Sequence, residues 1–334
     1  SLIAAARIKQ LYDEPGERAS HATKVPTLGG LAIFAGVIFA TCFWSNFKHI
    51  LQVHEFREFQ YITAALLIIF FIGIKDDVVG LSPFKKFLGQ IFAATIVVVW
   101  GNIRLTSLYG ILDIFEISEY FSIFISIFTI IVIINAYNLI DGINGLSASI
   151  GIISAFAFGT WFYLVGNNQF VYISFALVGA LIGFLRYNIS PARIFMGDTG
   201  SLLIGLIMAI LAIKFIEMNK GFSGEYKIRS VPVVAIGFLL LPLYDLFRVF
   251  ITRIYHRKSP FKPDKKHIHH RLLELGFSHS AATALLSVIS IAFIILVLLL
   301  QHIGPVILGL IIFVLASLLS LIPVFLIRKR NKAK

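Results

Sequence analysis

Long apolar runs recur along almost the whole chain, and they constrain the fold more than any other feature. A helix needs about 20 consecutive apolar residues to cross a bilayer. Only 14% of the 334 residues are charged, against about 25% in a soluble domain. We therefore predict an all-α, polytopic membrane bundle with about ten spans. These are expected at residues 27–47, 58–74, 87–101, 120–137, 145–165, 170–187, 200–217, 231–251, 280–302 and 305–327.

The chain is expected to form a single integral membrane domain over residues 1–334, because no segment has the composition of a soluble domain. Its first residues, SLIAAARIKQLY, resemble the last turns of a helix. This predicts a further membrane helix before residue 1, for a total of about eleven.

Lysine and arginine predict the orientation of the bundle. If residues 1–26 are cytoplasmic, about three quarters of the 29 Lys and Arg lie on that side, as the positive-inside rule requires. The cytoplasmic parts then include the N-terminal segment 1–26, the loop 252–279 and the basic tail 328–334. A net charge of +12 is accounted for by such loops beside anionic headgroups, and no nucleic-acid partner is expected.

The same orientation gathers the unusual polar motifs on the cytoplasmic side. A scattered structural role would not separate them in this way, so we predict one site built from several loops. The motifs are KVPTLGG (24–30), KDDVVG (75–80), NAYNLIDGINGL (135–146), RYNISPARIFMGDTGS (186–201) and PFKPDKKHIHHRLLELG (260–276).

Four aspartates lie in these motifs: Asp76, Asp77, Asp141 and Asp198. Carboxylate oxygens suit Mg²⁺ or Mn²⁺ rather than zinc. Carboxylates at the membrane edge are costly and are functional candidates by default. Adjacent residues of a helix point in different directions, so Asp76 and Asp77 are expected to have separate roles.

Two glycine-containing motifs, GDTGSLLIG and DGINGLSAS, each enter an apolar helix. Asp and Ser at such places are often only N-caps, but a helix start also suits phosphate. The segment HIHHR supplies His267, His269, His270 and Arg271. It is a poor zinc site but a good phosphate clamp, and the alternative is a basic segment at the membrane surface. For Lys85 and Lys86, the alternative to a role in the site is that their side chains simply extend to the membrane–water interface.

Together these residues predict phosphoryl transfer between a soluble nucleotide and a lipid-borne acceptor, a reaction that needs positioning and charge neutralisation. The alternative from another class is a transporter or lipid-binding protein that uses the carboxylates as an ion path. Transporter sites lie near the midplane between paired repeats, whereas these motifs lie at one membrane face.

The motifs KDDVVGLSPFKKFLGQ, NAYNLIDGINGL, FMGDTGSLLIG and SPFKPDKKHIHHRLLELGFS, with DEPGERASHATKVPTLGG before them, resemble the polyprenyl-phosphate N-acetylhexosamine-1-phosphate transferases over essentially the whole chain. PFKPDKKHIHH is similar to the WecA/TagO-like branch rather than the MraY-type, phospho-N-acetylmuramoyl-pentapeptide branch. The resemblance implies transfer of GlcNAc-1-phosphate from UDP-GlcNAc, a UDP-N-acetylhexosamine, to undecaprenyl phosphate, with release of UMP. It further implies a bacterial inner-membrane enzyme with a cytoplasmic active site that initiates an envelope polysaccharide such as O-antigen or teichoic acid, with a homodimer as one candidate assembly.

The resemblance also implies roles for single residues. Asp76 is the candidate base or nucleophile, Asp77 is its neighbour at the metal and pyrophosphate, and Asp198 is the principal Mg²⁺ ligand. Polar positions of the nucleotide and metal pocket are matched by Asn138, Asp141 and Asn188, the lipid-phosphate lysine by Lys86, and the catalytic histidines by His267, His269 and His270. Asn144 departs from the family's usual Asp and is not expected to be catalytic. Direct attack on the β-phosphorus is favoured over a covalent phosphoryl-Asp76 intermediate.

Overall fold

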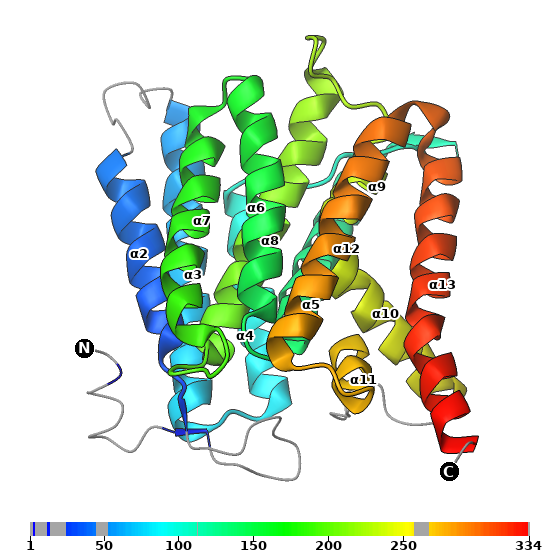
Figure 1. Cartoon of the computed structure of the whole chain (residues 1–334). Coiled ribbons are helices and arrows are strands. Elements are labelled where there is room, and N and C mark those ends of the chain that lie inside the picture. The colour runs from blue at the N-terminus through cyan, green and yellow to red at the C-terminus, as the bar shows by residue number, and fades with distance from the viewer. Residues whose placement is uncertain are drawn as a thin grey trace.

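The computed structural model describes residues 25–44, 53–111, 113–256 and 267–332, together with Ile3 and Tyr12–Asp13. Most of the predicted N-terminal motif and part of the predicted 252–279 loop therefore lie outside the described residues. The described chain folds into a bundle of long helices that run roughly side by side (Figure 1). In order, these are α2 (Gly29–Trp44), α3 (Val53–Val79), α4 (Pro83–Thr95) with its π-helical continuation Ile96–Trp100, α5 (Glu119–Ile140), α6 (Leu146–Leu164), α7 (Asn168–Asn188), α8 (Gly197–Gly221), α9 (Val231–Phe238), α10 (Leu240–Tyr255), α11 (Ile268–Glu274), α12 (His279–Leu300) and α13 (Pro305–Lys332).

A helix or helix pair lies at every one of the predicted spans, and the boundaries follow from local sequence. Asn167 caps α7 by accepting from the backbone N–H of Phe170 at 3.1 Å, and Ser278 caps α12 through Ala281 N–H at 3.2 Å. Pro83 stands in the first turn of α4, where its missing N–H costs no hydrogen bond. The helical bundle predicted from apolar runs is thus confirmed.

Fewer helices than the ten predicted spans are long and apolar enough to cross a membrane. Within the described residues, seven helices are long and apolar enough to cross a bilayer, or eight if α9 and α10 count as one broken span. The predicted span 231–251 is a pair of helices, because α9 and α10 meet at an angle of 86°. Leu239 separates them with non-helical backbone angles. Pro242 accounts for the break, because a proline cannot donate a hydrogen bond to the carbonyl four residues earlier, that of Phe238.

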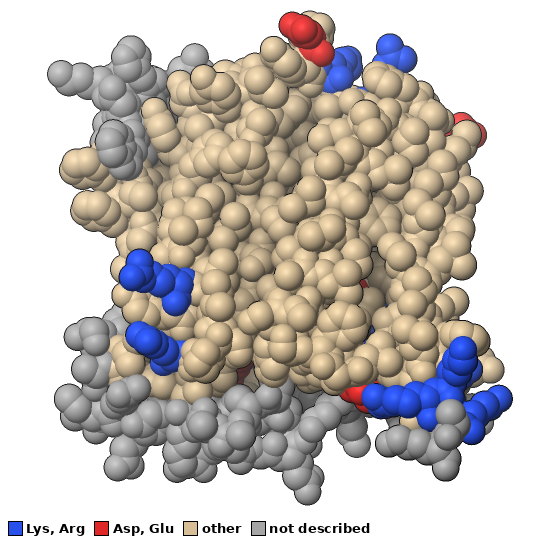
Figure 2. Space-filling view, viewed as in Figure 1, with Lys and Arg blue, Asp and Glu red and all other residues tan. Residues whose placement is uncertain are grey.

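Two short antiparallel ladders were not expected from an all-α prediction. Strands β1 (Tyr12–Asp13) and β2 (Val25–Pro26) pair near the N-terminus. Strands β3 (Ser107–Ile111) and β4 (Ile114–Glu116) form a hairpin between α4 and α5, at the end of the bundle opposite α11 (Figure 1). On the visible face, charged side chains lie at the top, at the left edge about halfway down and at the lower right, and a broad area between the top and these lower groups has no charge (Figure 2).

Helix α8 is the axis of the bundle, because 94% of its apolar window is buried inside the protein. A helix that is apolar on all sides is expected to be enclosed by others, and α8 packs against α2, α3, α5 and α6. One polar contact crosses this core: Lys214 Nζ lies 2.7 Å from Glu58 Oε1 on α3. The same ammonium lies 5.1 Å from the centre of the Phe170 ring.

Candidate active site

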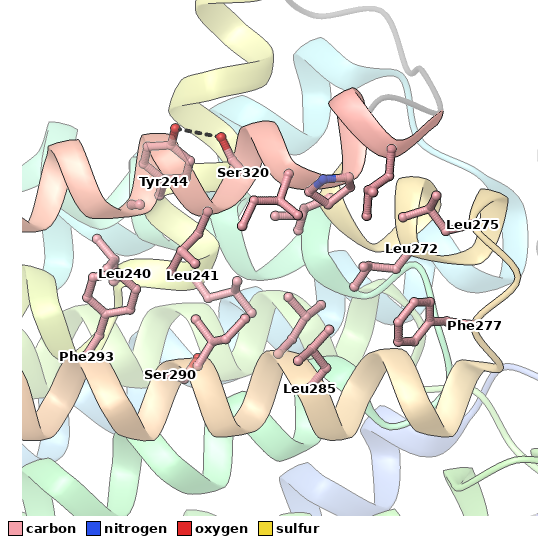
Figure 3. Close-up of a pocket in the computed structure, with 18 residues that line it drawn as sticks. Leu240, Leu241, Tyr244, Leu272, Leu275, Phe277, Leu285, Ser290, Phe293 and Ser320 are labelled. Carbon is pink, nitrogen blue, oxygen red and sulfur yellow. Dashed lines mark hydrogen bonds between the residues drawn. The ribbon is translucent and has the colours of Figure 1, made fainter. Parts of the chain in front are cut away.

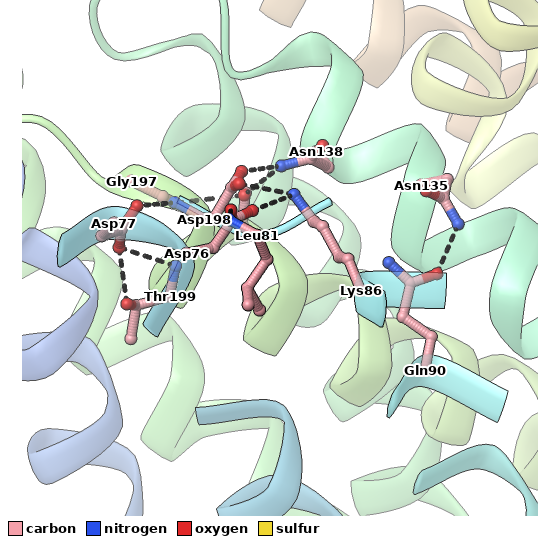
Figure 4. A network of polar contacts seen from close by, with 11 residues as sticks. Asp76, Asp77, Leu81, Lys86, Gln90, Asn135, Asn138, Gly197, Asp198 and Thr199 are labelled. Atoms are coloured by element: carbon pink, nitrogen blue, oxygen red, sulfur yellow. Dashed lines mark hydrogen bonds and ion pairs between the residues drawn. The ribbon is translucent and has the colours of Figure 1, made fainter. Parts of the chain in front are cut away.

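Asp76, Lys86, Asn138 and Asp198 form one polar network at a single end of the bundle (Figure 4). The Lys86 ammonium lies 2.5 Å from Asp198 Oδ2 and 3.0 Å from Asp76 Oδ2. On its other oxygen, Asp198 accepts a hydrogen bond from the Asn138 amide, which also donates to Ser201 Oγ at 2.9 Å. Residues from α3, α4, α5 and α8 are thereby brought together, although they lie far apart in the sequence.

Asp77 has a different partner from Asp76, as predicted for adjacent residues of a helix. Its carboxylate accepts from the backbone N–H of Asp198 at 2.7 Å and of Thr199 at 3.0 Å. The Thr199 hydroxyl donates to it at 2.6 Å. Asp77 therefore caps the first turn of α8, where free N–H groups and the helix dipole favour a negative charge. This contact fixes Asp198 relative to α3, and a metal contact of Asp77 stays a prediction.

Glycines of the KVPTLGG and GDTGS motifs allow the backbone to pack closely around Asp77 and the start of α8. The backbone of Gly29 and Gly30 donates to the carbonyls of Phe195 and Met196, both at 2.9 Å. Gly197 has a positive φ of 71°, and a Cβ there would lie 2.6 Å from both Asp77 Oδ2 and the Thr27 carbonyl. Only glycine fits such a position without strain. The predicted grouping of the KVPTLGG and GDTGS motifs is therefore confirmed for their described residues.

The carboxylates fit a hard divalent cation. Mg²⁺ is usually held by one or two carboxylates together with waters and substrate phosphates. Among the described residues, no group of three or more His, Cys, Asp or Glu side chains could hold a metal ion by itself. Two carboxylates, those of Asp76 and Asp198, nevertheless converge on one positive group, the Lys86 ammonium. This donor set suits a cation that the substrate helps to bind.

Asp141 follows α5 directly and lies at the edge of the same cluster. Burial raises the pKa of Asp141 to about 8, and the negative charges of Asp198 and Asp77 act in the same direction. A nearby cation would therefore favour its ionised form. The loop that follows is held by Asn188, which accepts from Gly145 N–H at 2.7 Å and donates to the Ile194 carbonyl at 2.8 Å. Because both ends of this amide are used, the structure favours a positioning role for Asn188.

The histidine segment forms a second network. His267 Nδ1 lies 2.8 Å from Asp245 Oδ2, and Ile268 N–H donates to the other Asp245 oxygen at 3.0 Å. Arg248 donates to the same carboxylate at 2.8 Å. Asp245 thus anchors the start of α11. Asp245 was not among the residues predicted from the sequence, although a carboxylate inside an apolar run is itself a signal of function.

His269 joins the two networks. A Cβ on Gly142 would lie 2.3 Å from His269 Nε2, so the ring packs directly against the backbone that follows Asp141. His269 is buried, and neither ring nitrogen has a hydrogen-bond partner among the described residues. Burial lowers the pKa of His269 to about 3, and the neighbouring His270 acts in the same direction. The ring centre of His270 lies 4.3 Å from that of His269.

The predicted site residues therefore converge from five segments. Asp76, Lys86, Asn138 and Asp198 share contacts, Asp77 caps the helix that carries Asp198, and Asp141 lies between this cluster and His269. Arg271 lies on α11, where burial and the positive charge of Arg248 lower its pKa. Asn144 donates its backbone N–H to His279 at 3.4 Å and accepts from Thr283 at 2.9 Å, so its described contacts are structural.

Comparisons with known proteins agree with this geometry. The family model described as glycosyl transferase family 4 matches residues 59–216. The decaprenyl-phosphate N-acetylglucosaminephosphotransferase of Mycobacterium tuberculosis is 34% identical over 286 residues, which cover 79% of this chain and 69% of that protein. A probable undecaprenyl-phosphate N-acetylglucosaminyl 1-phosphate transferase of Bacillus subtilis is 32% identical over 284 residues, covering 84% and 75%.

A more distant relative has the same kind of name. The undecaprenyl-phosphate alpha-N-acetylglucosaminyl 1-phosphate transferase of Escherichia coli K12 is 28% identical over 282 residues, which cover 83% of this chain and 73% of that protein. The segment matched by the family model includes Asp76, Asp77, Lys86, Asn138, Asp141 and Asp198. From the family match and the extent of these similarities, the chain belongs to glycosyl transferase family 4.

Proposed function

We propose that the protein transfers GlcNAc-1-phosphate from UDP-GlcNAc to undecaprenyl phosphate and releases UMP. The observation that carries the proposal is the Lys86 ammonium held between the carboxylates of Asp76 and Asp198 at the end of a membrane bundle. A phosphate acceptor needs a cation to hold it and a carboxylate beside it, and phosphoryl transfer needs little else from the protein. The relatives are named for this reaction with polyprenyl phosphates.

Each residue of the network would have one task. Lys86 would bind the acceptor phosphate by charge-assisted hydrogen bonds. Asp76, fixed by Leu81 N–H at 2.6 Å, would orient the attacking phosphate oxygen or accept its proton. Asp198, held by Asn138, would be the main protein ligand of Mg²⁺ or Mn²⁺, which would neutralise charge on the pyrophosphate oxygens when bound. His269 and His270 would donate to the donor's phosphates.

We favour direct attack of the acceptor oxygen on the β-phosphorus. The sugar C1–O bond is not broken, so the anomeric configuration is kept. Asp76 already contacts the Lys86 ammonium and the Leu81 N–H. These contacts suit a carboxylate that orients the acceptor phosphate. Incubation with radiolabelled UDP-GlcNAc in the absence of acceptor separates the mechanisms: label retained covalently on the wild type but not on Asp76→Asn would establish the phosphoryl-Asp76 route.

The test of the reaction is release of UMP by the purified protein with UDP-GlcNAc, undecaprenyl phosphate and Mg²⁺. Asp198→Asn keeps the side-chain shape and should reduce the rate at least about 100-fold, as expected for loss of a group that acts in the transition state. Asp113→Asn is a matched control, because Asp113 lies in the hairpin loop at the opposite end of the bundle and Asn tolerates its φ of 60°. Chelation of the metal should stop UMP release, and added Mg²⁺ should restore it. Unchanged turnover of the Asp198 variant would refute the proposed site.

The identity of the UDP-sugar donor is the most specific part of the proposal. A panel of UDP-sugars against one lipid acceptor distinguishes GlcNAc-1-phosphate transfer from transfer of another N-acetylhexosamine. Inclusion of the UDP-N-acetylmuramoyl pentapeptide tests the MraY-type alternative. We expect UDP-GlcNAc to give the highest kcat/KM, because the relatives above are named for N-acetylglucosamine.

We also propose that the active site faces the cytoplasm in the bacterial inner membrane. The support is the excess of Lys and Arg in the loops at that end. The chain has one cysteine, Cys42, so a Cys42→Ser background allows site-specific labelling. Glu274→Cys and Glu225→Cys are exposed at opposite ends, and only Glu225→Cys should react with an impermeant thiol reagent in intact cells with a permeable outer layer.

A further inference from the structure

A cavity of about 280 Å³ lies between α10, α11, α12 and α13, outside the carboxylate network. Figure 3 shows its lining side chains pointing into one space between α12 and α13. The helices α12 and α13 diverge toward the end of the bundle that carries the active site, and α11 lies across the gap (Figure 1). The cavity is therefore a wedge between two membrane helices, closed at its end by the helix of histidines.

The lining of this cavity is almost entirely hydrocarbon. Its tyrosine hydroxyl, on Tyr244, is already hydrogen-bonded to Ser317 and Ser320 at 3.1 Å each. Ser290 has the one lining hydroxyl without a partner among the described residues. An apolar cavity of about 150 Å³ is large enough for benzene and stays free of water. The larger cavity here suits part of an alkyl chain, because it offers almost nothing to a polar ligand.

The rim of the cavity opens within membrane-spanning helices. The rim residue Leu285 on α12 is 38% exposed, and Leu319 and Ile322 on α13 are 39% and 52% exposed. These residues would face the hydrocarbon of a bilayer, where the available apolar molecules are lipid chains. A lipid chain can therefore enter from the side without crossing water.

Basic side chains stand at the cytoplasmic end of the same cavity. Arg271 lies between the lining residues Ile268 and Leu272 of α11 and is close enough to Arg248 and Arg328 for their positive charges to disfavour its own. Arg328 lies two residues beyond the lining residue Leu326. Neither Arg271 nor Arg328 has an ion-pair partner within the part of the chain that the structure describes. Lys and Arg also gather at the lower right of Figure 2, where α13 ends.

We infer that this cavity binds one chain of an anionic membrane phospholipid, with the headgroup phosphate against Arg271 and Arg328. The apolar wedge and the arginines complement the two halves of such a molecule, because guanidinium groups bind phosphate well. Ile268 and Leu272 on α11, and Leu275 directly after it, line the cavity, while His269 packs against Gly142. The bound lipid therefore supports the helix that holds His269 beside Asp141.

The position of α11 favours a bilayer phospholipid over the acceptor substrate. The lining residues of α11 face the cavity, and the histidine that contacts Gly142 leaves the same helix in another direction. A polyprenyl chain in the cavity would have its phosphate beside Arg271, whereas neither Asp76 nor Lys86 lines the cavity. This inference reassigns Arg271 from substrate binding to lipid binding and does not depend on the identity of the sugar donor.

The test measures lipid binding directly on the full chain. Wild-type protein, purified in mild detergent, is mixed with phosphatidylglycerol or phosphatidylcholine, and bound lipid is counted by native mass spectrometry. Ala316→Phe fills the cavity, and Arg328→Gln removes a headgroup contact. The controls are Leu318→Phe, at a lipid-facing position of α13 that is 57% exposed, and Arg330→Gln, with the same charge change at the same helix end.

We expect wild type and both controls to retain one phosphatidylglycerol. Arg328→Gln should bind it about tenfold more weakly, the size of one lost charge-assisted contact. Ala316→Phe should bind it at least about tenfold more weakly, because the added ring takes the space of the alkyl chain. Equal retention by all proteins, or equal retention of phosphatidylcholine and phosphatidylglycerol, overturns the inference. Displacement of the phospholipid by undecaprenyl phosphate also overturns it, because the cavity would then hold the acceptor. Since the readout is bound lipid, it is independent of UMP release.

Discussion

Gly73 on α3 allows the closest approach between the two helices that carry the aspartates. A Cβ at this position would lie 2.4 Å from Thr199 Cα and 2.7 Å from Thr199 N. Both are backbone atoms of α8, which cannot rotate away as a side chain can. To reach ordinary contact at 3.4 Å, Gly73→Ala must open this contact by about 1 Å. Asp76 and Asp77 follow one turn later on α3, so they would move with Gly73.

The displacement acts on hydrogen bonds that are short in the native structure. The Thr199 hydroxyl lies 2.6 Å from Asp77 Oδ2, and an opening of about 1 Å takes such a pair beyond hydrogen-bonding distance. Overpacking of this kind costs about 1–3 kcal/mol of folding free energy. A misplacement of about 1 Å at a catalytic site costs on the order of 100-fold in rate. We therefore expect kcat for UMP release to fall by about 100-fold, with a modest decrease of Tm in detergent.

The matched controls are Gly179→Ala and Gly183→Ala on α7, where an added Cβ meets no atom within 4 Å. The same substitution there should leave kcat within about twofold of wild type and slightly raise stability, because alanine is the better helix former. Activity of Gly73→Ala within about twofold of wild type would show that the contact between α3 and α8 does not set the position of the aspartates.

Three further predictions concern the capping contact, the histidine helix and pH. Thr199→Val removes one of the three donors to Asp77 and should reduce kcat, while Thr160→Val, at an exposed hydroxyl of α6, should not; equal rates would contradict a positioning role of the cap. Asp245→Asn leaves Arg248 and His267 without a buried anion and should cost about 3–5 kcal/mol, seen as a lower Tm together with lost activity; an unchanged Tm would contradict the anchor. Burial lowers the pKa of His269 to about 3 from 6.5, so its stabilising effect is complete above pH 6.5 and is lost as pH falls toward 3. Thermal unfolding at pH 7 and 5 should show this loss in wild type and a smaller one in His269→Gln, and identical losses would exclude His269 as the cause.

The helices were predictable because membrane spans are set by length and hydropathy. Both α6 and α7 begin and end within about two residues of the predicted boundaries, since polar residues or a cap interrupt the apolar run there. The bend at Leu239 was not predicted, although Pro242 is a signal for it, because a proline removes the helical hydrogen bond to the carbonyl of Phe238. The hairpin at 107–116 has apolar residues without the length of a span, and its pairing depends on contacts with α8 such as Thr106 N–H to Glu217 at 2.8 Å.

The candidate site was predictable in its membership and less so in its contacts. Helix geometry predicted separate roles for Asp76 and Asp77; the structure gives the two carboxylates different partners, and their roles stay predictions. A cap by Asp198 itself was the alternative interpretation of GDTGS, and in the structure the cap of α8 is Asp77 on α3, because tertiary packing supplies the partner. Asp245 was missed since it lies within a predicted span. The homodimer and the predicted histidine roles stay predictions.

The Lys214–Glu58 contact has a consequence for how the protein is made. α3 leaves the ribosome well before α8, so Glu58 is already in the membrane when Lys214 arrives. A lone lysine costs about 2.5–3.5 kcal/mol at the bilayer centre and less toward the surface, and the partner on the earlier helix lowers the cost of inserting Lys214. The axis of the bundle is thus expected to enter the bilayer by docking on a segment synthesised earlier, and loss of Glu58 would be felt first as failed insertion of the later helix during biogenesis.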